Sequence, residues 1–199
     1  GAYRDWGGIV VYPGEIVVPR SEVDDSGVVH EYSQTVLGEA WSHGPVLLAW
    51  DVDAGHSLGQ DAGAQVVVHE FAHKLDMASG EANGCPLLPD DISQATWAAA
   101  FAPAYTHFSA AVDAWLARFG DTEDPPHPAD LEPDNPLWAL DPYAAEDPAE
   151  FFAVAAETFF VTPDLLQDAF PAVYAVLARY FGVDCAARAR HLVASGQHV

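Results

Sequence analysis

Two histidines four residues apart stand in a stretch of the chain that favours an α-helix. Residues 64–77 contain neither glycine nor proline, and Gly80 follows soon after them, as it does at many helix C-termini. In a helix, positions i and i+4 lie on one face, one turn apart, so His69 and His73 point the same way. Glu70 lies directly beside them. This segment is therefore expected to be a helix that presents two imidazoles and a carboxylate to one site.

The pattern of His69, Glu70 and His73 is typical of a zinc-binding helix. Two imidazoles one turn apart can reach a single Zn²⁺ at about 2.0–2.1 Å. The ion lowers the pKa of bound water from about 15.7 toward about 7, and the adjacent glutamate can take a proton from that water. The other interpretation is an amphipathic helix with two exposed histidines. The selectivity of the motif favours one zinc ion per chain, with Glu70 as a general base.

A catalytic zinc site needs a third protein ligand and one open position. No histidine stands at the HExxHxxGxxH spacing, so a carboxylate from a later helix is expected. Residues 147–160 begin with Asp-Pro-Ala-Glu, which predicts a helix with Asp147 as its N-cap. This helix offers Glu150 and Glu157, seven residues apart and on nearly the same face. Spacing leaves the choice open, because Glu150 also stands where a capping-box glutamate would.

The rest of the chain predicts an α+β fold, a small, mostly antiparallel sheet packed on helices. We expect a single domain over residues 1–199, with a β-rich part over 1–60 and a helical part over 61–199. Runs of β-branched and apolar residues predict strands at residues 8–12, 15–18, 28–37 and 45–50. Further helices are expected at residues 92–119, 147–160, 171–181 and 185–193. Pro103 should kink or break the first of these. Residues 121–146, rich in acids and prolines, predict a loop.

The chain is strongly acidic, with 30 Asp and Glu against 7 Lys and Arg and a net charge of -23. This excludes direct binding of nucleic acid, which requires basic side chains to neutralise phosphates. No apolar run reaches the roughly 18 residues of a membrane-spanning helix, so no membrane insertion is expected. Cys85 and Cys185 belong to no CxxC pattern. They fit structural thiols in a reducing, cytoplasmic setting.

Several segments occur in order over nearly the whole chain. They are Ile-Val-Val-Tyr-Pro at 9–13, Gly-Glu-Ala-Trp at 38–41, Gly-Pro-Val-Leu-Leu-Ala-Trp at 44–50, His-Glu-Phe-Ala-His-Lys-Leu-Asp at 69–76, Asp-Pro-Tyr at 141–143, Asp-Pro-Ala-Glu-Phe-Phe-Ala-Val at 147–154 and Glu-Thr-Phe-Phe at 157–160. Together they resemble the Mlc titration factor A family of bacterial zinc metallopeptidases. The active-site plan of that family is similar to that of the lethal factor of anthrax toxin.

The resemblance implies a zincin-like fold and a peptidase of amino- or oligopeptidase type that acts on peptides or proteins. In such enzymes the substrate extends along an edge strand above the zinc-binding helix, and residues 45–50 are the expected edge. The resemblance selects Glu150 as the third zinc ligand and implies that Tyr143, seven residues before it, is catalytic. A tyrosine hydroxyl there can donate a hydrogen bond to the oxyanion of the tetrahedral intermediate.

The name of the family also implies a transcriptional repressor of sugar transport genes as a partner. The alternative function is therefore a non-catalytic protein-binding module with a structural or vestigial zinc site. Structural zinc is usually closed by four protein ligands, so an open site with Glu70 intact favours catalysis. Asp76 shares the face of His73 and either orients an imidazole or caps a loop. Lys74, the only lysine, is expected to face away from the metal. Members of this family usually carry an additional N-terminal portion before the first strands, of which the present sequence has almost none.

Overall fold

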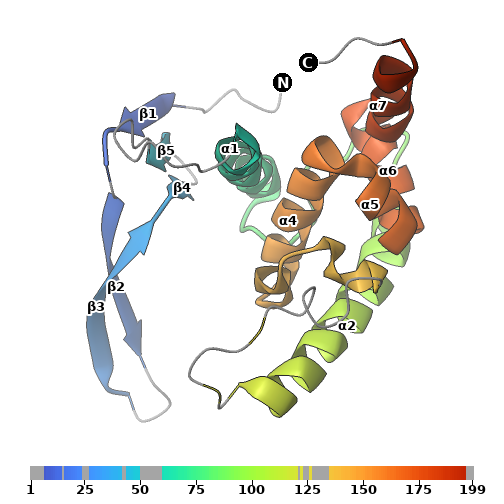
Figure 1. The fold of residues 1–199 in the computed structure, drawn as a ribbon. Coiled ribbons are helices and arrows are strands. Elements are labelled where there is room, and N and C mark those ends of the chain that lie inside the picture. The colour runs from blue at the N-terminus through green and yellow to red at the C-terminus, as the bar shows by residue number, and fades with distance from the viewer. Residues whose placement is uncertain are drawn as a thin grey trace.

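Strands come first in the chain and helices follow, which confirms the expected α+β class. The computed structural model describes residues 7–14, 16–23, 27–41, 44–49, 60–120, 122, 126 and 135–195. The helix that contains both motif histidines, α1 (Gln60–Asp76), lies at the centre of the arrangement. The strands lie on one side of α1, and the other helices lie on its opposite side (Figure 1).

The described residues contain five strands in two small sheets, where a single sheet was expected. The first sheet has the order β1 (Ile9–Tyr12), β5 (Val46–Ala49), β4 (Gly38–Ala40). In it, β1 runs parallel and β4 antiparallel to β5. The second sheet is an antiparallel hairpin of β2 (Ile16–Val23) and β3 (Val29–Val36). The runs at 8–12 and 15–18 are thus strands, as predicted, but they belong to different sheets.

The strand near residues 45–50 was expected at the edge of the sheet, and this prediction is wrong for the described residues. Strand β5 lies between β1 and β4, and its Val46 and Leu48 are buried. The edge beside α1 is formed by the three-residue β4, which was not predicted because Gly-Glu-Ala contains no β-branched residue. Trp50 lies outside the described residues.

Helix α2 (Gln94–Phe119) continues through Pro103, where a kink or break was expected. Proline has no N–H to offer the carbonyl of Ala99 one turn earlier. Both Pro103 and Ala99 are exposed, so water can satisfy that carbonyl and the helix is not interrupted. Helix α1 begins four residues earlier than predicted and ends in a 3₁₀ turn, η1 (Met77–Ser79).

Helix α4 (Pro148–Val161) begins as its sequence predicts, because Asp147 Oδ1 accepts the backbone N–H groups of Ala149 and Glu150 at 2.7 and 2.9 Å. Two 3₁₀ turns, η2 (Pro136–Ala139) and η3 (Pro142–Ala145), interrupt the loop expected before it. The chain continues into α5 (Pro163–Ala169), α6 (Pro171–Phe181) and α7 (Cys185–Ala194), of which the short α5 was not predicted. In the described parts of the chain, no helix combines the length and apolarity needed to cross a bilayer.

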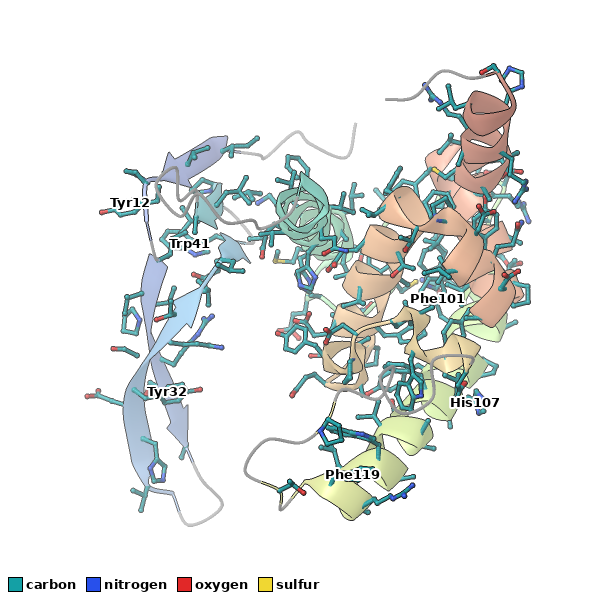
Figure 2. All side chains as sticks on the ribbon, in the orientation of Figure 1. Tyr12, Tyr32, Trp41, Phe101, His107 and Phe119 are labelled. Atoms are coloured by element: carbon teal, nitrogen blue, oxygen red, sulfur yellow. The ribbon has the colours of Figure 1, made fainter. Side chains whose placement is uncertain are left out.

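The hydrophobic core lies among the helices, and α4 runs through its middle. Phe152 of α4 is fully buried beside Trp97 and Phe101 of α2, whose rings stack at a centroid distance of 4.4 Å. Figure 2 shows Phe101 inside the helical body, whereas Tyr12 and Tyr32 point outward from the strands. Burying each large apolar side chain stabilises the fold by about 1.5–3 kcal/mol. The aromatic core therefore fixes α4, and with it the acidic side chains that face α1.

Candidate metal centre

Helices α1 and α4 pack together and bring three possible ligand atoms into a small triangle. The Nε2 atoms of His69 and His73 lie 3.0 Å apart. Glu150 Oε2 lies 3.1 Å from the first and 3.3 Å from the second. A tetrahedral zinc ion with bonds of about 2.0–2.1 Å separates its ligands by about 3.3 Å. The triangle therefore has the size of one face of a zinc coordination sphere, and these three residues can hold a metal ion.

The burial of the Glu150 carboxylate also fits a cation at the centre of the triangle. Its Oε2 atom is buried and has no partner of hydrogen-bond geometry among the described residues, although both imidazoles are close. A buried carboxylate oxygen without a partner is costly, and native proteins rarely keep one without a reason. The carboxylate turns toward the imidazoles, while the N-cap role at this helix belongs to Asp147. Two nitrogens and one oxygen form a donor set that suits zinc.

The electrostatics of the triangle favour a positive charge at its centre. Burial opposes protonation of His69, but the close, negatively charged carboxylates of Glu150 and Glu157 outweigh it and raise its pKa to about 10. Burial likewise opposes ionisation of Glu150, yet its contacts with His69 and His73 lower the pKa of this carboxyl to about 2. The surroundings thus stabilise imidazolium next to carboxylate. A metal ion brings the same sign of charge to the same place.

Glu70 lies beside the triangle, on the side of the strands, with only 7% of its surface exposed. Burial raises the pKa of its carboxyl to about 6, against the opposing effect of His69 and His73. Strand β4 approaches this carboxylate closely at Gly38, where a Cβ atom would stand 2.6 Å from Glu70 Oε1. Only glycine leaves the carboxylate room in its present position. The side chain is thus held next to the triangle as a buried base.

Tyr143 comes from the turn η3 and faces the triangle from the solvent side. Asp141 Oδ1 accepts the backbone N–H of Tyr143 at 2.8 Å, and this contact begins the turn. The ring centroids of Tyr143 and His69 lie 6.2 Å apart. Burial, and next the charge and hydrogen bond of Glu150, raise the pKa of the phenol to about 12. The hydroxyl therefore stays protonated at neutral pH and can donate a hydrogen bond.

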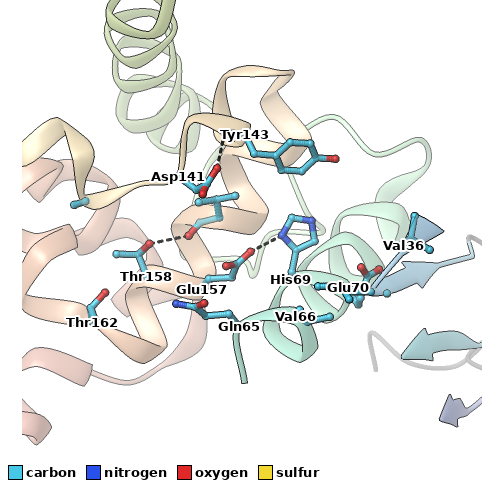
Figure 3. A pocket seen from close by; sticks show the side chains of 14 residues that line it. Val36, Gln65, Val66, His69, Glu70, Asp141, Tyr143, Glu157, Thr158 and Thr162 are labelled. Carbon is cyan, nitrogen blue, oxygen red and sulfur yellow. Dashed lines mark hydrogen bonds and ion pairs between the residues drawn. The ribbon is translucent and has the colours of Figure 1, made fainter. Parts of the chain in front are cut away.

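The second candidate glutamate contacts the opposite side of the first imidazole. Glu157 Oε1 lies 2.5 Å from His69 Nδ1 (Figure 3), and both side chains are less than one-fifth exposed. The two nitrogens of an imidazole point in divergent directions, so Glu157 does not belong to the triangle at Nε2. Spacing along the chain predicted Glu157 only as an alternative ligand. Its place on the same helical face as Glu150 was the signal that the two residues could approach one histidine.

Asp76 is fully buried and anchors the loop after α1, which supports the loop-capping alternative. Its Oδ2 atom accepts the N–H groups of Asn83 and Gly84 at 2.8 and 2.6 Å. Trp97 Nε1 donates to the carbonyl of Gly84 at 2.8 Å. Gly84 has a φ of +79°, and a Cβ atom there would stand 2.3 Å from the carbonyl oxygen of Pro148. This loop therefore presses directly on the first turn of α4.

Lys74 faces the strands rather than the triangle, as expected. Its Nζ donates to the carbonyls of Trp41 and Gly44 at 2.5 and 2.9 Å, and the side chain is 7% exposed. These carbonyls belong to the turn that joins β4 to β5. The ammonium group thus fixes α1 against the sheet whose edge strand approaches Glu70.

An open cavity of about 550 Å³ adjoins the triangle. Its walls come from the strand edge, from α1, from the turns η2 and η3, and from α4 and the residue after it (Figure 3). The lining includes Val36, Leu37, Gly38, His69, Glu70, Asp141, Tyr143, Glu157 and Thr158. A cavity of this size holds small ligands or a few residues of a peptide. The candidate base Glu70 and the candidate ligand His69 therefore border a space that can hold a substrate.

Residues 1–182 match a protein family described as glucose-regulated metallo-peptidase M90. The chain belongs to this family. Relatives named Mlc titration factor A are 36% identical over 191 residues in Pectobacterium atrosepticum, 35% over 189 in Serratia proteamaculans and 32% over 192 in Salmonella gallinarum. These alignments cover 94%, 94% and 96% of the chain but only 63%, 63% and 64% of the relatives. The resemblance found in the sequence is confirmed, and the chain spans a little under two thirds of the length of these curated relatives.

Proposed function

We propose that this chain is a single zincin-like domain that hydrolyses peptide bonds with one zinc ion. His69, His73 and Glu150 hold the ion, Glu70 is the general base, and Tyr143 stabilises the oxyanion. The observation that carries the proposal is the triangle of Nε2, Nε2 and Oε2 atoms, whose edges of 3.0, 3.1 and 3.3 Å suit zinc. Membership of a metallo-peptidase family supports the reaction class.

The side chains around the triangle supply the remaining steps of hydrolysis. A bound zinc ion acts as a Lewis acid and brings the pKa of its water toward about 7. Glu70, with a pKa of about 6, is ionised at neutral pH and takes the proton of the attacking water. It then returns that proton to the leaving amine. Tyr143, which its raised pKa keeps protonated, donates a hydrogen bond from its hydroxyl group to the oxyanion.

We further propose that the peptide lies along the edge of β4. Among the described residues, β4 pairs only with β5, so the backbone groups of its other edge are open to an extended chain. Residues 36–38 line the cavity next to Glu70. Addition of a peptide as a further strand uses main-chain hydrogen bonds, and pockets for alternate side chains provide specificity. This placement brings a scissile bond next to the buried base.

The test of catalysis is the substitution Glu70→Gln, which keeps the shape of the side chain and removes its basicity. With a library of fluorescence-quenched peptides, hydrolysis should fall by about 10²- to 10⁴-fold. Zinc content should remain at the wild-type level. A matched substitution, Glu150→Ala, should instead abolish stoichiometric zinc. Cleavage by Glu70→Gln at the wild-type rate, or full zinc in Glu150→Ala, would contradict the assignment.

A second function, binding of a transcriptional repressor in the cytoplasm, is favoured by the name of the relatives. They are called titration factors of Mlc, and we propose an Mlc-type repressor as a partner of this chain too. The net charge of -23 suits a partner with a basic surface, since complementary charge speeds association. Isothermal calorimetry with purified Mlc should show binding by both wild type and Glu70→Gln. If only hydrolysis is found, the partner proposal is wrong; if only binding is found, the chain is a non-catalytic module.

A further inference from the structure

Helix α4 contacts His69 at both of its ring nitrogens. Glu150 Oε2 lies 3.1 Å from Nε2, and Glu157 Oε1 lies 2.5 Å from Nδ1. The two glutamates are seven residues apart, which is nearly two helical turns, so they point toward α1 from the same face. We propose that Glu157 is a positioning residue of the metal centre, which fixes the ring and the tautomer of His69 so that Nε2 faces the ion. This inference rests on the proposed zinc site.

The chemistry of the imidazole explains why this contact matters. A neutral imidazole has a single N–H, and either nitrogen can hold it. A carboxylate next to Nδ1 keeps the hydrogen there, which leaves the lone pair of Nε2 free for a metal. Carboxylates that accept the N–H of a metal-bound histidine orient the ring and increase its basicity. Glu157 therefore acts on the metal only through His69.

The backbone of α4 around Glu157 is held by other residues, so the Glu157 side chain can be removed without moving the helix. Its helical neighbours Ala153 and Ala156 are fully buried, and Thr158 Oγ1 donates to the carbonyl of Val154 within the same helix. The backbone of α4 at this point is thus fixed by the core. The Glu157 carboxylate itself projects away from the core and lines the cavity. Truncation of the side chain should therefore remove the contact with His69 and leave the helix in place.

The experiment compares the zinc affinity of wild type, Glu157→Ala and Glu157→Gln by competition with a chromophoric chelator. Loss of a carboxylate that supports a ligating histidine typically weakens metal binding by about 10- to 100-fold, and this is expected for Glu157→Ala. Glu157→Gln should lose less, because its amide oxygen still accepts the N–H without the charge. The control is Glu146→Gln, which removes one exposed negative charge near Tyr143 and should leave zinc affinity unchanged.

A second readout separates positioning from a general structural effect. In zinc-loaded protein with ¹⁵N-labelled histidine, the Nδ1–H proton of His69 should give a downfield, slowly exchanging signal. This signal should disappear in Glu157→Ala, while the far-UV circular dichroism spectrum of the metal-free protein stays that of wild type because α4 keeps its fold. The inference is overturned if Glu157→Ala binds zinc as tightly as wild type, or if Glu146→Gln loses as much affinity. Wild-type affinity in Glu150→Ala would instead contradict the zinc site itself.

Discussion

Replacement of Gly84 by alanine tests how tightly the loop after α1 is fitted against α4. Gly84 has a φ of +79°, and left-handed backbone costs a non-glycine residue about 1–2 kcal/mol. The added Cβ would also stand 2.3 Å from the carbonyl oxygen and 2.8 Å from the carbonyl carbon of Pro148. Both are backbone atoms, so either the loop or the first turn of α4 has to shift. Overpacking of this kind costs about 1–3 kcal/mol, and the total expected loss is about 2–5 kcal/mol.

The free energy of unfolding is measured by urea denaturation of the metal-free protein, with circular dichroism as the signal. Gly182→Ala is the matched control, because its φ is +68° but an added Cβ meets nothing within 4 Å. Its free energy of unfolding should fall only by the cost of the left-handed backbone, about 1–2 kcal/mol. Gly84→Ala should also weaken zinc binding, since Pro148 stands two residues before Glu150. Equal losses of unfolding free energy in the two variants would show that the loop does not press on α4.

Three further predictions concern the strands, the helix α1 and the metal. Gly38→Ala should displace the Glu70 carboxylate by about 1 Å and lower kcat/KM by about 10²-fold; zinc content and urea stability should stay near wild type, and unchanged kinetics would refute the contact. Lys74→Met should lower the free energy of unfolding by about 1.5–3 kcal/mol for each charged hydrogen bond lost, measured by denaturation; an unchanged midpoint would contradict a structural role. Removal of zinc by a chelator should lower the melting temperature, because excess ion at about 100 times its Kd stabilises by about 2.7 kcal/mol; Zn²⁺ should restore it and Mg²⁺ should not.

Features set by local sequence were predictable here. The shared face of His69 and His73 and the N-cap at Asp147 follow from helical periodicity and from side chains that bond to nearby backbone. The same periodicity placed Glu150 and Glu157 on one face. It could not say which atom of His69 each would meet, because that depends on how α1 and α4 pack.

Features set by contacts between distant segments were not predictable. The parallel pairing of β1 with β5 joins strands that are separated by the whole β2–β3 hairpin. Strand β4 has no β propensity of its own and exists because β5 supplies its hydrogen-bond partners. The need for glycine at position 38 comes from its close approach to Glu70, a residue of another element. Strand order and edges are thus decided by pairing, which one sequence does not reveal.

The contact between α1 and α4 also determines when a metal ion can bind. His69 and Glu157 are 88 residues apart in the chain, and closing a loop of that length costs about 4 kcal/mol of chain entropy. Burial of the aromatic side chains of α4, such as Phe151 and Phe152, offsets this loss of entropy when the protein folds. The ion is not needed to close the loop. We therefore expect the proposed zinc ion to enter and leave a chain that remains folded.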